Sequence, residues 1–383
     1  MRILHLFSNT KLTGPAEPAI NLCASLKKIG YRVMFACCTS SKTGSKSVLA
    51  TAAERGLEPI TRFRLNKHLN IKDNMYDLRR MPSFLKEART TIVHAHMDND
   101  HLVGGRSARK AGQKTVVVRS SYSGEGMKPS FRTRYLLRKL TDGLLVASES
   151  AKLSIIEQFN FPEERIWVVG GAVDTDRFNG ADGSPSVRSR FGLCEEDFVF
   201  GVVARIQPHR RFNVILEAIS RVSGRDPAVR LLIAGRGTHM REVAVEPVRR
   251  MRLENFVKFA GYQVGQDYVD TLACLDALIY LMPGTDGTCR AVREAMAMGK
   301  PIIAARRGML PEIVDHGRNG LIIEDSPDAL AEAIRYLVRN RDVARSMSAQ
   351  SFKKASEKFR LDRQAREVAR IYEEVLKMGR MTG

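Results

Sequence analysis

Residues 283–323 read PGTDGTCRAVREAMAMGKPIIAARRGMLPEIVDHGRNGLII. An apolar run leads into this stretch, and the helical pattern of residues 291–298 ends at Gly299-Lys300-Pro301, a typical helix stop. We expect Gly287 and Thr288 near the helix start, where unpaired N–H groups and the helix dipole attract an anion. The stretch therefore predicts a strand, an anion-binding turn and a helix of a parallel α/β sheet.

Two acids, Asp286 and Glu294, bracket this turn with seven residues between them. At helical pitch, we expect Glu294 about two turns inside the helix. One interpretation makes Asp286 an N-cap and Glu294 an exposed helix charge. The other makes both acids ligand contacts, and the stretch alone does not separate the two.

The same alternation of short apolar runs and helical patterns covers the whole chain, which predicts parallel sheets in α/β layers. Several runs are apolar throughout, as in strands buried on both faces. The predicted strands are residues 3–7, 33–36, 91–94, 115–118, 144–147, 166–169, 198–203, 231–234, 256–259, 277–281, 301–304 and 321–323.

The longest stretch of turn-forming residues, 179–186, marks a domain boundary in a chain of 383 residues. We predict an N-terminal domain over residues 1–178, a C-terminal domain over 187–360 and a last helix within 361–383. That helix carries one apolar stripe, which must pack on a domain. The stripe consists of Val368, Ile371, Tyr372, Val375 and Leu376.

Composition and charge restrict the class of protein. Hydrophobic residues make up 44% and charged residues 27%, as in ordinary globular proteins, and no apolar run reaches the roughly 18 residues of a membrane span. Six cysteines without C-x-x-C spacing fit free thiols in a reducing cytosol, so we expect a cytoplasmic protein without a zinc site. Residues 1–170 carry 28 Lys and Arg against 14 Asp and Glu, which indicates an anionic partner. No zinc-finger, RNA-recognition or basic-zipper pattern supports nucleic acid as that partner.

A second cluster lies at Ala204-Arg205-Ile206-Gln207-Pro208-His209-Arg210-Arg211, directly after the predicted strand 198–203. Ligands of α/β sheets bind at the carboxyl ends of strands, and arginines there suit phosphate oxygens. A solvated basic loop is the alternative; it fits Arg211 better than Arg205, which follows a buried strand.

These motifs resemble family 4 of the retaining glycosyltransferases. The resemblance covers nearly the whole C-terminal half in order and spacing, and it is less diagnostic in the N-terminal half. It rests on Arg205 and Arg210, Gly235-Arg236-Gly237, Phe259-Ala260-Gly261-Tyr262, Asp286 to Glu294 with Ala295 to Pro301, Gly308, Pro311-Glu312-Ile313-Val314 and Gly317, and in the first half on Gly14 with Glu17, Val93-His94-Ala95-His96, Gly171 to Asp174 and Arg177-Phe178.

The resemblance implies a GT-B fold, in which two Rossmann-like domains face an interdomain cleft and the C-terminal helix crosses back to the N-terminal domain. It also implies that the C-terminal domain binds a nucleotide-diphosphate sugar and the N-terminal domain the acceptor, without a metal or other cofactor. Arg205 and Arg210 would then neutralise the diphosphate, Glu294 would bind the ribose, and Asp286 with the amides of Gly287, Thr288 and Cys289 would contact sugar and phosphates. His96 would lie beside the sugar as a catalytic candidate, and Gly14, Gly261, Tyr262 and Arg290 complete the expected binding residues.

The sequence departs from the family pattern at four positions. The first acid is Asp286 instead of glutamate, and the basic partner is Arg210 where lysine is usual. Pro15 stands where a second glycine is common, and it offers no N–H. Met309 follows Gly308 in place of a second glycine.

Other signals leave alternatives open. Without the resemblance, His96 is a structural histidine; we expect His94 on the opposite face of the strand and interpret it as structural. The D-x-D patterns Asp98-Asn99-Asp100 and Asp174-Thr175-Asp176 fit helix caps and turns better than a metal site. A basic N-terminal surface fits either a solvated face or peripheral contact with an anionic membrane. It comprises residues 131–140 with Arg62, Arg64, Lys67, Arg79 and Arg80.

The sequence thus predicts a retaining, metal-independent glycosyltransferase that uses a nucleotide-sugar donor and a carbohydrate or lipid-linked acceptor in cell-envelope polysaccharide synthesis. The alternatives are a GT-B nucleotide-sugar epimerase or hydrolase and a non-catalytic basic binding protein.

Overall fold

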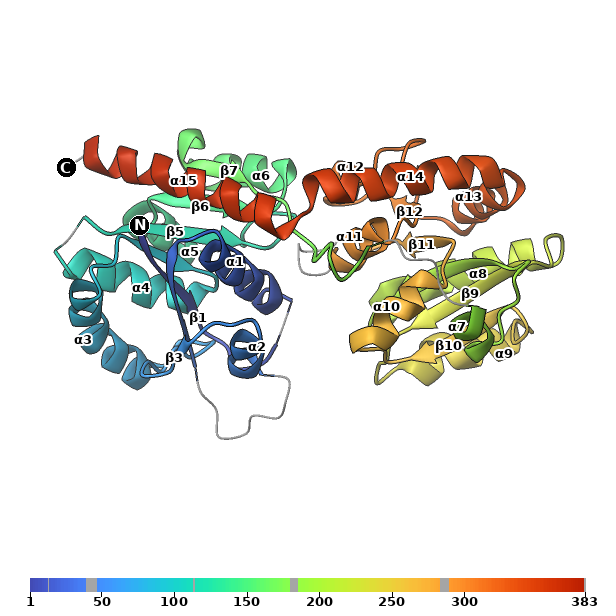
Figure 1. Ribbon diagram of the computed structural model, residues 1–383, viewed down its shortest axis with the longest axis horizontal. Helices are drawn as coiled ribbons and strands as arrows, with labels where there is room; N and C mark the ends of the chain where they lie inside the picture. Colours follow the sequence, from blue (N-terminus) through green and yellow to red (C-terminus); the bar gives the residue numbers. More distant parts are fainter. Residues whose placement is uncertain (13, 39–46, 113, 180–184, 283–288, 382–383) are drawn as a thin grey trace. The chain divides into compact units, whose positions relative to one another are not determined.

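The computed structural model describes every residue except 13, 39–46, 113, 180–184, 283–288 and 382–383 (Figure 1). The described chain folds into two compact units: residues 1–172 with 361–381, and residues 173–282 with 289–360. The first unit ends before the predicted boundary at residue 178, because Val173 pairs with the second unit. The Val173 N–H donates to the carbonyl of Phe359 at 2.7 Å. Most of the predicted boundary segment, residues 180–184, lies outside the described residues.

The first unit contains a seven-stranded parallel sheet in the order β3-β2-β1-β4-β5-β6-β7. Its strands are β1 (Arg2–Phe7), β2 (Arg32–Cys37), β3 (Pro59–Ile60), β4 (Ile92–Ala95), β5 (Val116–Ser121), β6 (Gly143–Val146) and β7 (Ile166–Val168). Its helices are α1 (Ala16–Lys28), α2 (Val48–Glu54), α3 (Ile71–Glu87), α4 (Asp98–Lys110), α5 (Phe131–Leu140), α6 (Glu149–Phe159), the 3-10 turn Glu163–Arg165 and α15 (Leu361–Met381).

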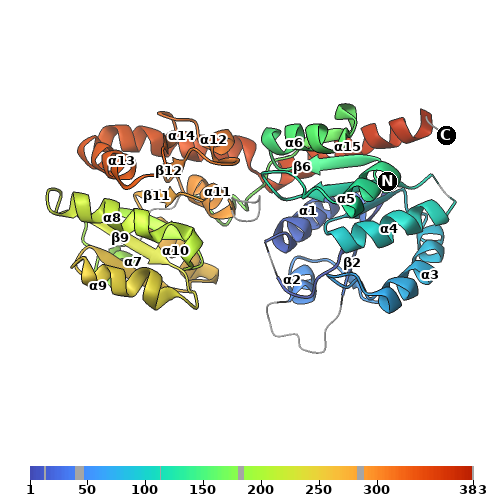
Figure 2. The same ribbon diagram turned by 180° about the vertical axis from the view of Figure 1, so that it is seen from behind.

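Neighbouring residues of β1 show why helices cover both faces of this sheet. Ile3 belongs to a buried core that α1 and α15 complete, and Leu4 belongs to a core that α3 and α4 complete. Successive side chains of a strand point to opposite faces, so an apolar strand needs a helix layer on each side. Figure 1 and, from behind, Figure 2 show these layers.

The last helix packs on the first unit, as its apolar stripe and the family resemblance predict. Val368, Ile371 and Val375 are buried in the core that contains Ile3. The Tyr372 hydroxyl lies 2.5 Å from His94 Nδ1, and Trp167 Nε1 donates to Glu374 Oε2 at 2.9 Å. Helix α15, which follows the second unit in sequence, therefore completes the core of the first unit.

The second unit contains a six-stranded parallel sheet in the order β10-β9-β8-β11-β12-β13. Its strands are β8 (Phe198–Val203), β9 (Val229–Ala234), β10 (Val257–Gly261), β11 (Ala277–Tyr280), β12 (Ile302–Ala305) and β13 (Gly320–Ile323). Its helices are α7 (Pro185–Arg190), the 3-10 turn η2 (Pro208–Arg210), α8 (Phe212–Ser223), the π-turn Arg241–Val245, α9 (Glu246–Arg250), α10 (Gly265–Ala273), α11 (Arg290–Ala297), α12 (Leu310–Ile313), α13 (Pro327–Arg339) and α14 (Arg341–Lys358).

One large apolar core joins α8 and α13 to this second sheet. Phe200 of β8, Ile219 of α8 and Ile334 of α13 are all buried in it. The predicted α/β architecture with two parallel sheets is therefore confirmed. Among the described helices, none combines the length and apolar composition that crossing a membrane requires.

Candidate functional site

The second sheet has its topological switch point between β8 and β11, which are neighbours in the strand order. Ligands of parallel sheets bind beside such a point, at the carboxyl ends of the strands. Residues 204–211 follow β8, Leu281 follows β11, and Cys289 stands at the N-cap of α11. The arginine cluster and the described ends of the connection between β11 and α11 thus lie at one edge of the same sheet.

Arg205 and Arg210 are the two guanidiniums after β8 that have no acidic partner among the described residues. Arg205 is exposed, and Arg210 Nε is buried without a hydrogen-bond partner. Arg211 differs, because its Nε lies 2.9 Å from Asp325 Oδ2, so this arginine is ion-paired and the alternative of a solvated basic loop does not describe it. Asp325 is nearly buried and also binds Arg307 at 2.8 Å. The loop after β8 therefore holds two arginines that have no acidic partner in the described part of the chain and one that is committed to the fold.

Two glycines fix the backbone on which Arg205 stands. A Cβ at Gly235 would lie 1.9 Å from the Ala204 carbonyl oxygen, and a Cβ at Gly237 would lie 1.8 Å from that of Ile206. The Ile206 N–H donates to the carbonyl of Arg236 at 3.1 Å. The Gly-Arg-Gly motif is thus required by close packing of two loops at the site.

Gly261 ends β10 at the same edge, and Tyr262 follows it. The Arg236 guanidinium lies over the Tyr262 ring at 4.1 Å, and Tyr262 is 48% exposed. Gly261 has a φ of 71°, and its carbonyl accepts from the Gly235 N–H at 2.8 Å. An exposed aromatic ring backed by a guanidinium offers a flat surface on which a base can stack.

Glu294 is buried, so the exposed helix charge that one interpretation expects is wrong. Its side chain is 5% exposed. Tyr268 donates its hydroxyl to Glu294 Oε2 at 2.6 Å, and Arg290 Nε lies 3.1 Å from Glu294 Oε1. A buried carboxyl needs such partners, because an unpaired one costs several kcal/mol or more. The two contacts fix the direction of both oxygens.

The start of α11 is only partly described. Cys289 is buried and stands at the N-cap, and Arg290 opens the helix. Glu294 is therefore little more than one turn inside α11, less than the two turns expected. Asp286, Gly287 and Thr288 lie outside the described residues.

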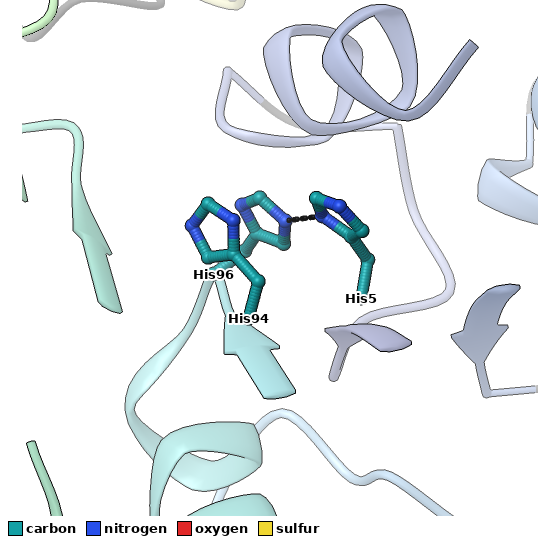
Figure 3. A group of neighbouring side chains, drawn as sticks. All are labelled: His5, His94 and His96. Carbon is teal, nitrogen blue, oxygen red and sulfur yellow. Dashed lines mark hydrogen bonds between the residues drawn. The ribbon is translucent and has the colours of Figure 1, made fainter. Parts of the chain in front are cut away.

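In the first unit, His96 follows β4 at that sheet's own switch point, between β1 and β4. It is 1% exposed. His96 Nε2 lies 2.9 Å from His5 Nδ1 (Figure 3). His96 Nδ1 lies 2.6 Å from the Tyr122 hydroxyl. Both ring nitrogens are thus held, which fixes the orientation of the imidazole.

His94 lies on the same face as His96, so the expectation of opposite faces is wrong. The two rings stack with centroids 4.3 Å apart, because residues two apart in a strand share a face (Figure 3). Burial lowers the pKa of His5 to about 3 and holds the pKa values of His94 and His96 well below the usual value. The cluster is neutral at pH 7.

A metal ion is the first ligand to consider for three imidazoles whose nitrogens lie within 4.8 Å of one another. His94 already contacts the hydroxyls of Tyr372 and Ser120, at 2.5 and 2.8 Å. The planes of His94 and His96 differ by 23° in a stack, so their in-plane lone pairs run nearly side by side instead of toward one ion. The geometry is that of a hydrogen-bonded cluster.

Gly14 and the first D-x-D pattern lie near the same edge of the first sheet. Gly14 is exposed in the turn before α1. Asp100 accepts from the N–H groups of Ser8 and Met97 at 3.0 and 2.8 Å, and burial raises its pKa to about 7. Asp98 pairs with Arg119 at 2.9 Å. These are helix-cap and ion-pair contacts. In the second pattern, Asp174 caps the turn at Arg177 in the same way.

Comparison with known families assigns both halves of the chain. The family description "Glycosyltransferase Family 4" matches residues 14–177, and "Glycosyl transferases group 1" matches residues 197–340. The chain belongs to glycosyltransferase family 4.

Relatives of this family-4 chain are distant in sequence. A D-inositol 3-phosphate glycosyltransferase of Saccharomonospora viridis is 26% identical over 68% of the chain and 66% of the relative. Another from Streptomyces bingchenggensis is 24% identical over 75% of the chain and 67% of the relative. An N-acetyl-alpha-D-glucosaminyl L-malate synthase of Bacillus anthracis is 22% identical over 79% of the chain and 80% of the relative. The matches thus span about two thirds of the first two relatives.

Solved structures share the GT-B fold over the whole family-4 chain. A glycosyltransferase from Rickettsia africae has a TM-score of 0.84 at 18% identity and covers 98% of both chains. Anabaena HepE in complex with UDP has a TM-score of 0.80 at 19% identity and covers 98% of this chain and 100% of its own. The fold predicted from the resemblance is confirmed.

Two site residues of the family-4 chain escaped the sequence analysis. Tyr268 lies in the middle of α10, where a tyrosine at helical spacing looks like an ordinary packing residue. His5 lies inside an apolar strand far from His96 in sequence. Only the strand pairing of β1 with β4, which sets His5 opposite His94, brings it to the cluster.

Proposed function

We propose that this protein transfers a glycosyl unit from a nucleoside-diphosphate sugar to an acceptor hydroxyl, with retention of configuration and without a metal. The observation that carries the proposal is the pair Arg205 and Arg210, two guanidiniums at the carboxyl end of β8 that have no acidic partner among the residues that the structure describes. Family membership supports it, as does HepE, a structural neighbour whose complexes contain UDP and UDP-glucose.

In this reaction, Arg205 and Arg210 stabilise the leaving diphosphate. As the bond between the sugar carbon and the diphosphate oxygen breaks, the electron pair moves to that oxygen, and the sugar carbon bonds to the acceptor oxygen. Cations fixed in advance stabilise the growing charge on the diphosphate without reorganising. In the front-face route, the departing phosphate oxygen takes the acceptor proton, so no protein base is required.

The remaining residues have binding roles in this proposal. Glu294, its oxygens fixed by Tyr268 and Arg290, accepts hydrogen bonds from the ribose hydroxyls. Tyr262 stacks on the base. The sugar and the phosphates are contacted by Asp286, Gly287, Thr288 and Cys289. The sugar and the acceptor are also contacted by Gly14 and His96. The acceptor is a carbohydrate or a lipid-linked one at the cytoplasmic face of a membrane, in envelope polysaccharide synthesis.

A thermal-shift panel of UDP, GDP, ADP and their sugars, with EDTA present, tests this function. One nucleoside diphosphate should raise the melting temperature, and Arg205→Ala should weaken its binding about tenfold or more, since a charge-assisted hydrogen bond contributes about 1.5–3 kcal/mol.

Arg306→Ala is the matched control, because Arg306 follows β12 at the same edge of the sheet but binds Glu324 at 3.3 Å. Its affinity for the diphosphate should be unchanged. A strict requirement for a divalent metal would overturn the mechanism. Hydrolysis or epimerisation of the sugar without transfer would favour the alternative enzyme, and binding of no nucleotide would favour the non-catalytic alternative.

A further inference from the structure

The first unit exposes large apolar side chains beside cations at the starts of two helices. Ile71 opens α3 and is 75% exposed, and Phe131 opens α5 and is 88% exposed. Leu69 and Met75 are 59% and 45% exposed on the same segment as Ile71. Met75 lies four residues after Ile71, so the two share a face of α3. Exposed apolar groups of this size usually mark an interaction site.

Cations outnumber acids around these side chains. Residues 61–75 contain four Lys and Arg and one acid, Asp73, which accepts from Asn66 Nδ2 at 2.5 Å, and residues 127–140 contain five Lys and Arg and no acid. Lys67, Lys72 and Lys128 are exposed and have no acidic partner among the described residues. The two segments therefore combine apolar and positive character.

A buried amide network holds the two helix starts in place. Asn99 Nδ2 donates to the Asn66 carbonyl at 2.8 Å, and Asn74 Nδ2 donates to Asn99 Oδ1 at 3.0 Å. Arg132 Nη2, one residue after Phe131, donates to the same Asn99 oxygen at 3.3 Å. Asn74 and Asn99 are 5% and 1% exposed. The apolar side chains thus stand on one rigid edge, at which α3, α4 and α5 all begin.

We propose that this edge is a docking surface for an anionic lipid bilayer, with Leu69, Ile71, Met75 and Phe131 entering the interface. Each cation near an anionic bilayer strengthens binding about fivefold. Apolar side chains gain further when they leave water. Nucleic acid would use the cations and leave the aliphatic side chains in water, so the bilayer fits the surface better. The link from this surface to a lipid-linked acceptor rests on the proposed function; the surface itself does not.

Sedimentation with vesicles tests the surface. Wild-type protein should bind vesicles that contain phosphatidylglycerol, and bind vesicles of phosphatidylcholine alone much more weakly. The double variant Ile71→Ser, Phe131→Ser should lower the partition coefficient about tenfold or more at any salt concentration. Lys67→Glu with Lys72→Glu should lower it at low salt, with an effect that fades as salt screens the charges.

Leu153→Ser is the matched control, since Leu153 is 64% exposed on α6, between Glu149 and Glu157. Its partition coefficient should equal that of the wild type. The proposal is overturned if wild-type protein ignores anionic vesicles, if Leu153→Ser weakens binding equally, or if the protein binds duplex with a steep salt slope and no vesicle.

Nucleotide binding and vesicle binding test the proposed function and the docking surface separately. Vesicle binding without nucleotide binding refutes the proposed function and keeps the surface. Nucleotide binding without vesicle binding supports the proposed function and refutes the docking surface.

Discussion

The orientation of the Glu294 carboxylate depends on a single hydroxyl group, that of Tyr268. Tyr268→Phe removes the 2.6 Å hydrogen bond to Glu294 Oε2 but keeps the ring that packs edge-on against Phe178. We expect unfolding in urea to show a loss of about 1–3 kcal/mol, because a buried carboxyl oxygen loses its donor. The affinity for the stabilising nucleoside diphosphate should also fall.

Tyr336→Phe is the control for this prediction, because Tyr336 is 44% exposed on α13 and lies outside the candidate site. It should leave the free energy of unfolding within about 0.5 kcal/mol of the wild type. Equal stability of Tyr268→Phe and the wild type would show that the hydroxyl does not hold Glu294.

At this scale, the sequence predicts residues whose neighbours in the chain carry the signal. Arg205 follows an apolar strand, and Glu294 lies at a fixed distance from Asp286. His5 and Tyr268 could not be predicted, because their partners are far away in sequence and only the packed fold brings the side chains together. The burial of Glu294 was missed for the same reason.

At the scale of elements, the loops after β8 and β9 pack tightly against each other. Gly235→Ala would place a Cβ 1.9 Å from the Ala204 carbonyl oxygen, and backbone atoms cannot move aside cheaply. We expect it to destabilise the protein by about 1–3 kcal/mol. It should also weaken nucleotide binding, since Arg205 stands on the displaced loop. Circular dichroism during thermal unfolding and nucleotide titration measure the two effects.

Gly224→Ala provides the comparison, because Gly224 ends α8 with φ −71° and nothing within 4 Å of an added Cβ. It should be neutral, or stabilising by about 0.4–1 kcal/mol. If both variants behaved alike, close loop packing would not be the reason for the glycine at position 235.

Strands are predicted well by the sequence because they are buried on both faces. All twelve predicted strands are present, whereas β3 (Pro59–Ile60), two residues at the edge of the sheet, gives too short an apolar run to be recognised. The helical pattern of residues 291–298 matches α11 within one residue at each end, whereas Glu294 lies nearer the start of the helix than the two turns expected.

Across the whole molecule, buried histidines are concentrated in the first unit. Burial lowers the pKa of His5 to about 3 and keeps those of His94, His96 and His101 well below the usual value. Below about pH 6.5, the unfolded chain therefore binds protons that the folded one does not, and stability falls with pH. Asp100 acts in the opposite sense, because burial raises its pKa to about 7 and the folded state then holds the extra proton. Burial also raises the pKa values of Asp77 and Glu367 in the first unit, so these two carboxyls act in the same sense as Asp100. The four histidines outnumber the three carboxyls, so the histidines dominate.

We therefore expect the free energy of unfolding of the first unit, measured in urea, to fall between pH 7 and pH 5, by about 1.4 kcal/mol per pH unit for each net proton. Trp167, the only tryptophan, lies on β7 and reports this unit by fluorescence. His5→Gln should reduce the slope by about one proton, whereas His209→Gln, at an exposed position of the second unit, should not change it. If the slope in His5→Gln equals that of the wild type, His5 is already protonated in the folded protein below pH 6.5. The hydrogen-bonded pair of His5 and His96 would then not be neutral in acid.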